Sequence, residues 1–143
     1  MVNLYRASLG LDTLQWDNRL FAVALGHSID MRTRHFFSHI NPDGNGSFVR
    51  LALAGIRYDR AGENLARGQT SPSSVMRSWL FNPAHRHNIE NPYFSCQGIG
   101  YDSVSHFWTH VFISPPTQFK PDQAVPFLRW HDGVLLMKSS NKR

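Results

Sequence analysis

The sequence contains little cysteine, little glutamate and no long apolar run. One cysteine, Cys96, stands among 143 residues, so an internal disulfide framework is excluded and this thiol is expected to be buried. No apolar run approaches the roughly 20 residues that cross a bilayer, and residues 1–6 lack the charged-then-apolar pattern of a signal peptide. The sequence therefore shows no sign of export, although a signal peptide that is removed from a mature protein would not be visible in it.

Lysine is also scarce, and arginine supplies most of the positive charge. The chain has 12 arginines and 3 lysines and a formal net charge of +5. Because the arginines are scattered and form no dense basic run, nucleic-acid binding is only weakly indicated. The hydrophobic fraction of 41% and the aromatic fraction of 13% predict a packed core rather than disorder, and the length fits one main domain.

Periodic apolar positions predict helices and strands in mixed order. The clearest helical stripe follows Asp17 or Asn18, either of which can act as N-cap, and it consists of Leu20, Ala24, His27, Ser28 and Met31. Further helices are expected over 3–9, over 47–54, and from Pro72 to a stop at Pro83. An extended segment is expected over 56–65, entering a turn at Gly62-Glu63, and a hairpin over 96–102 and 107–113. Helices combined with antiparallel strands indicate the α+β class.

The composition changes after Ile113, which predicts a main domain over 1–113 and a separate tail over 114–143. Four prolines mark the start of the tail as a linker: Pro115, Pro116, Pro121 and Pro126. Residues 127–130 and 134–137 flank His131-Asp132-Gly133, a pattern typical of a hairpin with a three-residue loop. Because an isolated hairpin is marginal in water, we expect it to pack on the main domain or on a partner.

Glu63 is the residue most suggestive of a functional site. It is one of two glutamates in the chain and lies in the run Ala61-Gly62-Glu63-Asn64-Leu65, whose other members are small or apolar enough to be buried. A carboxylate in such a position must be paired, hydrogen-bonded or bound to a metal. Histidine-bearing segments on either side, over 35–44 and 82–89, can supply such partners. The sequence therefore predicts a His/Glu pocket.

Short motifs along residues 1–113 resemble, in order, those of the CAP superfamily (cysteine-rich secretory proteins, antigen 5 and pathogenesis-related 1 proteins), in its disulfide-free bacterial branch. The matching segments include Gly10-Leu11-Asp12-Thr13-Leu14-Gln15-Trp16, Phe37-Ser38-His39-Ile40-Asn41-Pro42-Asp43-Gly44, Ala61-Gly62-Glu63-Asn64-Leu65-Ala66, His85-Arg86-His87-Asn88-Ile89, Gly98-Ile99-Gly100-Tyr101 and Trp108-Thr109-His110-Val111-Phe112. The resemblance implies an α-β-α sandwich with a central antiparallel sheet between helices. It also implies an extracellular or periplasmic location and a cleft of two histidines and two acidic residues that holds zinc in some members.

The resemblance transfers to three residues of this chain. His39 matches the first family histidine and Glu63 the acidic residue of the Gly-Glu-Asn motif, whereas the second glutamate falls near Asn82 and the second histidine on Phe107. The bacterial branch instead has a histidine at His85. A triad of His39, Glu63 and His85 remains as the predicted catalytic and metal-binding set, and two imidazoles with one carboxylate meet the minimum for zinc. The alternative is an ion-pair and hydrogen-bond cluster that satisfies Glu63 and pins the loops.

The other histidines receive structural roles. We expect His27 to be a hydrogen-bonded core or boundary residue, His35 to lie at a helix C-terminus, and His87 to face solvent or a loop. His106 is expected in a loop. His110 is expected at an exposed edge, with a position facing the cleft as the alternative. Arg86 is expected to pair with Asp43 or Glu90, and Asn64 and Asn88 to brace turns.

Three functions compete at this point. The first is a secreted binding domain whose cleft takes an unidentified small molecule, lipid, glycan, peptide or protein. The second is a zinc-assisted hydrolase, such as a nuclease or peptidase, in which His39, Glu63 and His85 hold the metal or Glu63 acts as general base. The third is a scaffold whose histidines are structural.

Overall fold

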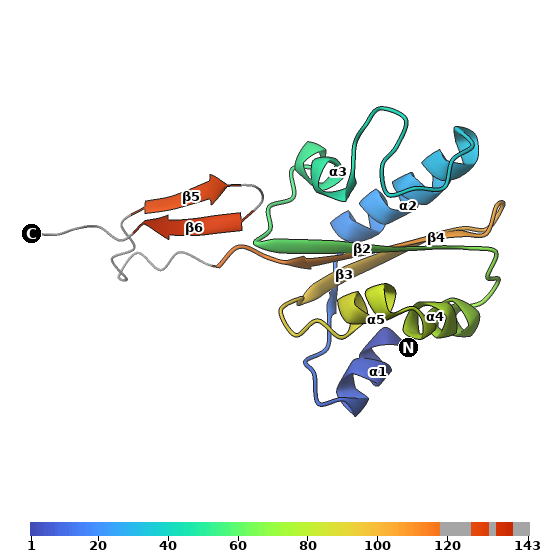
Figure 1. Cartoon of the computed structure of the whole chain (residues 1–143), viewed down its shortest axis with the longest axis horizontal. Coiled ribbons are helices and arrows are strands. Elements are labelled where there is room, and N and C mark those ends of the chain that lie inside the picture. The colour runs from blue at the N-terminus through green and yellow to red at the C-terminus, as the bar shows by residue number, and fades with distance from the viewer. Residues whose placement is uncertain (118–126, 132–133, 139–143) are drawn as a thin grey trace, which may run out of the picture.

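A four-stranded sheet lies between two layers of helices (Figure 1). The structure is a computed structural model that describes residues 1–117, 127–131 and 134–138, with side chains for residues 1–117. Its elements, in chain order, are α1 (Val2–Ser8), β1 (Gln15–Trp16), α2 (Asn18–Thr33), α3 (Ser47–Leu53), β2 (Arg60–Arg67), α4 (Pro72–Phe81), α5 (Pro83–Ile89), β3 (Cys96–Asp102), β4 (Phe107–Ser114), β5 (Phe127–His131) and β6 (Val134–Lys138).

The sheet has the strand order β1-β3-β4-β2. Strands β2 and β3 both run antiparallel to β4, and the two-residue strand β1 adds a parallel pair beside β3. Helices α2 and α3 cover one face, while α1, α4 and α5 lie on the other (Figure 1). The predicted α-β-α sandwich is therefore confirmed, and so is the hairpin of β3 and β4, with β1 as a short parallel addition at one edge.

Helix α2 packs directly on β3 because two positions of that strand carry no side chain. A Cβ at Gly98 would lie 2.2 Å from the backbone nitrogen of Phe21, and one at Gly100 would lie 2.1 Å from that of Leu25. The buried residues of α2 are those of the predicted stripe, and the Asp17 side chain caps the helix by accepting from the Arg19 N–H. The apolar pattern and the cap were thus correctly interpreted.

Alternation along β4 divides the core into two clusters. Val111 and Ile113 pack with Leu20 and Ala24 of α2, whereas Trp108 and Phe112 pack in the cluster that contains α1 and α4. Residues directly opposite each other on paired strands share a face. Glu63 is opposite Val111 and therefore faces the layer of α2 and α3, while its neighbour Asn64 is opposite His110 and faces α5.

The expected turn at Gly62-Glu63 is wrong, because both residues lie inside β2. All eight residues of β2 pair with β4, from Arg60 opposite Ser114 to Arg67 opposite Phe107. Gly62 meets the other layer closely, since a Cβ there would lie 3.0 Å from the Phe94 ring. The glycine indicated a turn, but its role is to admit a neighbouring ring next to a continuous strand.

The chain also forms a helix that the sequence pattern did not predict. Pro83 was expected to end a helix, and α4 does end at Phe81, but Pro83 is then the first residue of α5. Asn82 is the N-cap, and its Oδ1 accepts from the backbone nitrogens of Ala84 at 3.0 Å and His85 at 3.4 Å. A proline at the first helical position, after a capping asparagine, favours a start as much as a stop.

The tail forms the predicted hairpin at the backbone level. Strands β5 and β6 pair antiparallel in a sheet of their own, and His131 belongs to β5 opposite Val134, so the expected three-residue loop is one residue too long. The loop residues 132–133 and the packing of the hairpin side chains lie outside the described residues. Among the helices that are described, none is long and apolar enough to cross a membrane. Cys96 is buried, as predicted.

Candidate functional site

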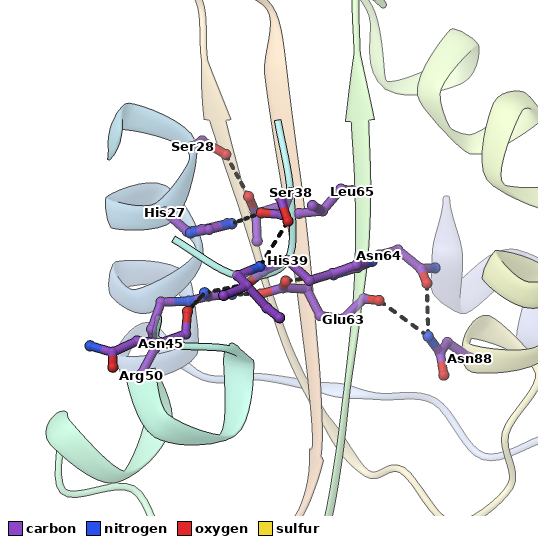
Figure 2. A network of polar contacts seen from close by, with 12 residues as sticks. His27, Ser28, Ser38, His39, Asn45, Arg50, Glu63, Asn64, Leu65 and Asn88 are labelled. Carbon is purple, nitrogen blue, oxygen red and sulfur yellow. Dashed lines mark hydrogen bonds and ion pairs between the residues drawn. The ribbon is translucent and has the colours of Figure 1, made fainter. Parts of the chain in front are cut away.

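Glu63 lies at the centre of a polar network on the α2–α3 face of the sheet (Figure 2). One carboxylate oxygen, Oε1, lies 2.8 Å from Nδ1 of His39, and the other, Oε2, accepts from Nη2 of Arg50 at 2.5 Å. The Glu63 side chain is 3% exposed, while that of His39 is 54% exposed. The carboxylate is therefore covered by its own two partners, and the imidazole forms the solvent-facing part of the site.

Arg50, which belongs to helix α3, donates hydrogen bonds to strand β2 and to the loop that carries His39. Besides Glu63, its Nη1 donates to the carbonyl of His39 at 2.7 Å and to that of Asn45 at 3.0 Å. The loop between those two carbonyls is closed by Asn41, whose Oδ1 accepts from the backbone nitrogens of Asp43 and Asn45. The Arg50 side chain is 10% exposed. This guanidinium both neutralises the buried carboxylate and fixes the loop that carries His39.

His27 supports the same loop from helix α2. Its Nε2 lies 2.9 Å from the carbonyl of Ser38, the residue before His39, and its ring is buried. Because a carbonyl only accepts, Nε2 is the protonated nitrogen of the His27 ring. Burial lowers the pKa of His27, although the negative charge of Glu63 acts in the opposite direction. His27 is thus the hydrogen-bonded core histidine that was predicted, and it positions the site.

The charge state of Glu63 follows from its partners. Burial alone would raise its pKa, but the hydrogen bond from His39 and the charge and hydrogen bond of Arg50 together lower it below the ordinary value of 4.5. Glu63 is therefore ionised at neutral pH and can only accept hydrogen bonds. It follows that Nδ1 of His39 is the donor, so a neutral His39 ring has its lone pair on Nε2.

His85 lies near this network without joining the carboxylate. It belongs to α5, and its backbone carbonyl accepts from Nδ2 of Asn64 at 2.9 Å. Burial lowers the pKa of the His85 ring, and His39 lowers it further whenever its own ring is protonated. His85 is consequently neutral at pH 7, and its ring is within electrostatic reach of His39. The structure brings His39 and Glu63 into contact and leaves His85 as a neighbour.

The asparagines brace the opposite side of β2. Nδ2 of Asn88 donates to the Glu63 carbonyl at 3.3 Å and to Oδ1 of Asn64 at 2.8 Å (Figure 2). The indole nitrogen of Trp79 donates to the Leu65 carbonyl at 3.0 Å. The predicted side-chain to backbone bonds of Asn64 and Asn88 are present, but they join β2 to α5 instead of bracing turns. These contacts also occupy carbonyls along an edge strand, where a further strand could otherwise pair.

The described side chains do not fit zinc in their present arrangement. Within residues 1–117, no group of three His, Cys, Asp or Glu side chains is placed to hold a metal ion. Both oxygens of Glu63 already have partners, and one partner is the cation Arg50, which repels a second cation. The fit would require Glu63 to leave Arg50. The predicted metal role of His39, Glu63 and His85 therefore remains a hypothesis without a preformed site.

The remaining histidines lie where sequence reasoning succeeded in part. His87 is exposed, and His35 follows the C-terminus of α2, both as expected.

The prediction that His110 lies at an exposed edge is wrong. His110 is fully buried between the rings of Trp79 and Phe112, and its Nε2 lies 2.9 Å from Oε1 of Gln97. Burial lowers its pKa to about 3. Its strand is central in the sheet, and α4 covers that face. The Arg86–Glu90 ion pair is present at 4.0 Å.

Arg50 is the site residue that sequence reasoning missed. A buried carboxylate needs a partner, and histidines near in sequence were considered first. Arg50 could have been considered because the buried Glu63 carboxylate needs a partner with a full positive charge, which a neutral imidazole does not provide. Nothing in the local pattern of 47–53 marks this arginine, because the 38–45 loop brings it to Glu63.

Fold and site together define a domain of the CAP type, and the family comparison agrees. The model of the cysteine-rich secretory protein family, CAP, matches residues 1–114. The chain belongs to this family.

Relatives of known sequence or structure support the same assignment. The Bacillus subtilis protein YkwD is 38% identical over 113 residues, which are 79% of this chain and 44% of YkwD. An extracellular Bacillus anthracis protein containing an SCP domain has a TM-score of 0.74 at 34% identity, over 78% of this chain and 37% of that protein. An outer surface protein of Borrelia burgdorferi has a TM-score of 0.73 at 20% identity, over 80% of this chain and 87% of that protein, which shows the fold alone. The chain spans less than half the length of the two Bacillus proteins.

Proposed function

We propose that this chain is an extracellular binding domain that uses His39 to recognise a ligand rich in hydroxyl or amide groups, as glycans and peptides are. The observation that carries the proposal is the exposed His39 imidazole, held at Nδ1 by a buried, ionised carboxylate. No hydrogen bond within the described residues occupies Nε2 of His39. In the neutral ring that nitrogen accepts, so it suits an O–H or N–H donor of a ligand. An extracellular location is supported by the extracellular Bacillus anthracis relative.

Charge balance favours an uncharged ligand over an anionic one. Arg50 offsets the charge of Glu63, and His85 is neutral at pH 7 because its pKa is lowered. With the His39 ring neutral, the site therefore has little net charge with which to attract a phosphodiester or a charged lipid headgroup. Five arginines of the described part are in ion pairs with the protein's own carboxylates, which also weakens the case for nucleic acid: Arg19, Arg32, Arg34, Arg50 and Arg86.

Preorganisation is the physical reason to expect binding rather than a merely structural cluster. His27, Arg50 and Asn41 hold the 38–45 loop through backbone carbonyls and nitrogens, so the position of His39 is fixed before a ligand arrives. Fixing a contact group in advance lowers the entropy lost on binding. A cluster that only satisfied Glu63 would not need to leave the His39 side chain 54% exposed.

The test is the binding of tetra-N-acetylglucosamine, measured by calorimetry. This oligomer presents both hydroxyl and amide groups. Cellotetraose, with hydroxyls alone, and tetra-alanine, with amides, distinguish the two chemistries. His39→Ala should weaken binding by about 10-fold or more, the effect of losing one hydrogen bond to a charge-supported group. His87→Ala is the matched control, because His87 is an exposed histidine of α5. Equal binding by the His39 variant and the wild type, or no binding of any of the three probes, would contradict the proposal.

A hydrolase remains the second candidate, on one specific observation. The His39–Glu63 pair has the geometry of a base oriented by a carboxylate, with Nδ1 and Oε1 2.8 Å apart. In that reading His39, rather than the covered Glu63, takes the proton from water. Release of products from the same oligomers by the wild type, and not by His39→Ala, would establish it. Zinc content measured by mass spectrometry on untagged protein tests the metal-assisted version independently.

A further inference from the structure

A hollow lies at the C-terminal end of α2 and is not lined by Glu63 or His39. It has a volume of about 500 Å³ and is formed by the segment after α2, the end of β2 and the turn between β3 and β4. That volume is within the roughly 300–1,000 Å³ typical of small-molecule sites. Arg67, which lines it, follows Glu63 by four residues along β2, which corresponds to roughly 13 Å at about 3.3 Å per residue. The hollow is therefore distinct from the His39–Glu63 contact.

One wall of the hollow is aromatic and open to solvent. The rings of Phe37 and Phe107 are stacked, with centroids 5.8 Å apart and an interplanar angle of 26°. Phe37 is 39% exposed, and Val104 on the facing turn is 73% exposed. Exposed aromatic rings that are already stacked offer a flat face to a further planar group at little entropic loss.

The charges of the hollow do not balance. Arg32 is held by Asp102, with Nε 2.8 Å from Oδ2. Arg67 has no carboxylate within ion-pair distance among the described residues, and its Cζ lies 5.0 Å from the centre of the Phe37 ring. A guanidinium with free N–H groups binds carboxylate or phosphate in a bidentate manner. Arg67 thus places one uncompensated anion receptor beside the aromatic wall.

The backbone around the hollow is held in an unfavourable conformation. His35 and His106 are the two non-glycine residues with positive φ in the described part of the chain, both at 57°. His35 lines the hollow at the end of α2, where the Phe36 nitrogen donates to the Met31 carbonyl and glycine is the usual residue. His106 precedes Phe107 and bonds to the Tyr101 hydroxyl at 2.6 Å. Side chains kept at strained positions tend to gather at functional sites.

We propose that this hollow binds a small organic anion with a planar aromatic body. The aromatic part stacks on the Phe37–Phe107 pair, the carboxylate or phosphate is received by Arg67, and His35 provides a further polar contact at the rim. The proposal does not depend on the function of His39, since none of the residues that carry it belongs to the Glu63 network.

The experiment follows the backbone resonances of the full 143-residue chain by NMR while 2-naphthoate or 2-naphthyl phosphate is added. Saturable shifts should centre on Phe37, Arg67 and Phe107. Neutral 2-naphthamide should bind about 10-fold more weakly, the loss of a charge-assisted contact, and inorganic phosphate, which lacks the ring, should also bind more weakly. The stronger of the two anions identifies whether carboxylate or phosphate is preferred.

Matched variants complete the test. Arg67→Ala should weaken 2-naphthoate binding by about 10-fold or more, for the same reason. Arg60→Ala is the control, because Arg60 is at the other end of the same strand and also lies over an aromatic ring, 3.7 Å from the centre of Tyr93. His39→Ala should leave this binding unchanged, which separates it from the first site. Equal loss in the Arg67 and Arg60 variants, equal affinity for 2-naphthamide, or no saturable shifts at the hollow would overturn the proposal.

Discussion

A buried titratable side chain keeps its charge on one face of the sheet and loses it on the other. The two residues, Glu63 and His110, lie close together in the sheet, because His110 of β4 is paired with Asn64, the residue next to Glu63 in β2. On the α2–α3 face Glu63 keeps its charge, because Arg50 and His39 lower its pKa below the ordinary value despite burial. On the α4–α5 face His110 loses its charge, because burial with no compensating carboxylate lowers its pKa to about 3.

The difference lies in what covers each face. A loop and a short helix cover Glu63, and they bring a guanidinium and backbone carbonyls that can pair with charge and fix one another. Helix α4 covers His110 with the ring of Trp79, and Gln97 offers an amide oxygen. A face closed by a loop can therefore hold an exposed recognition group, whereas a face closed by helices becomes core. Substitutions that alter one face at a time test this contrast.

The largest effect is expected for Glu63→Gln. The substitution removes the charge but keeps the shape, and it leaves Arg50 unpaired at 10% exposure. Breaking one partner of a buried pair destabilises by about 3–5 kcal/mol. Urea denaturation at pH 7 measures the change. The double variant with Arg50→Met should recover much of the loss, and a loss below about 1 kcal/mol in the single variant would mean that the pair is solvated.

A close second is expected for Gly100→Ala on the same face. The new Cβ would lie 2.1 Å from the Leu25 backbone nitrogen, so α2 must move away from β3. Overpacking destabilises by about 1–3 kcal/mol, and a clash with backbone, which cannot rotate away as a side chain can, places this change at the upper end of that range. Thermal unfolding measures the loss. If Gly100→Ala has a wild-type melting temperature, then α2 does not lie as closely on the sheet as described.

His110→Gln tests the other face through pH. The unfolded histidine takes up a proton near its ordinary pKa of 6.5 and the folded one near 3, so the unfolded state binds more protons between these values. Stability is then fully present above about pH 6.5 and falls as the pH is lowered, by about 1.4 kcal/mol per pH unit. Denaturation between pH 6.5 and 5 should show this slope reduced in the variant by about half a proton at pH 6.5 and by nearly one proton at pH 5. His27 and His85, whose pKa values are also lowered, contribute equally to both proteins.

A smaller effect is expected for His39→Ala. The His39 side chain is 54% exposed, so its contact with Glu63 is screened by solvent. We expect a loss of about 0.5–1 kcal/mol of stability, small beside the loss for Glu63. Chemical denaturation of the variant at pH 7 measures it. A loss as large as that of Glu63→Gln would show that His39 is structural, which would weaken its assignment to recognition.

The smallest effect, and of opposite sign, is expected for Gly26→Ala. Gly26 is in the same helix as Leu25 but faces open space, because a methyl group added there would have no other atom within 4 Å beyond its own helix. Alanine in a helix interior is more favourable than glycine by about 0.5–1 kcal/mol. A raised melting temperature is the expected result, and it serves as the control for Gly100→Ala.

Much of this architecture could be predicted from the sequence, and the exceptions have physical reasons. The α2 stripe and the β3–β4 hairpin follow from local periodicity, which a sequence displays directly. The strand through Gly62 and the helix after Pro83 do not, because both residues are breakers whose effect depends on which neighbour they meet. The pairing of His39 with Glu63 was within reach through the cost of a buried carboxylate, while Arg50 depends on the path of a loop.

The most direct test of the central claim is to measure the pKa of the Glu63 carboxyl by carbon NMR titration of labelled protein. With Arg50 and His39 as partners, the Glu63 pKa should lie below 4.5, and it should rise in Arg50→Met because burial then acts with less opposition. A value at or above 4.5 in the wild type, or no change in the Arg50 variant, would contradict the claim that Glu63 is the buried, ionised anchor of His39.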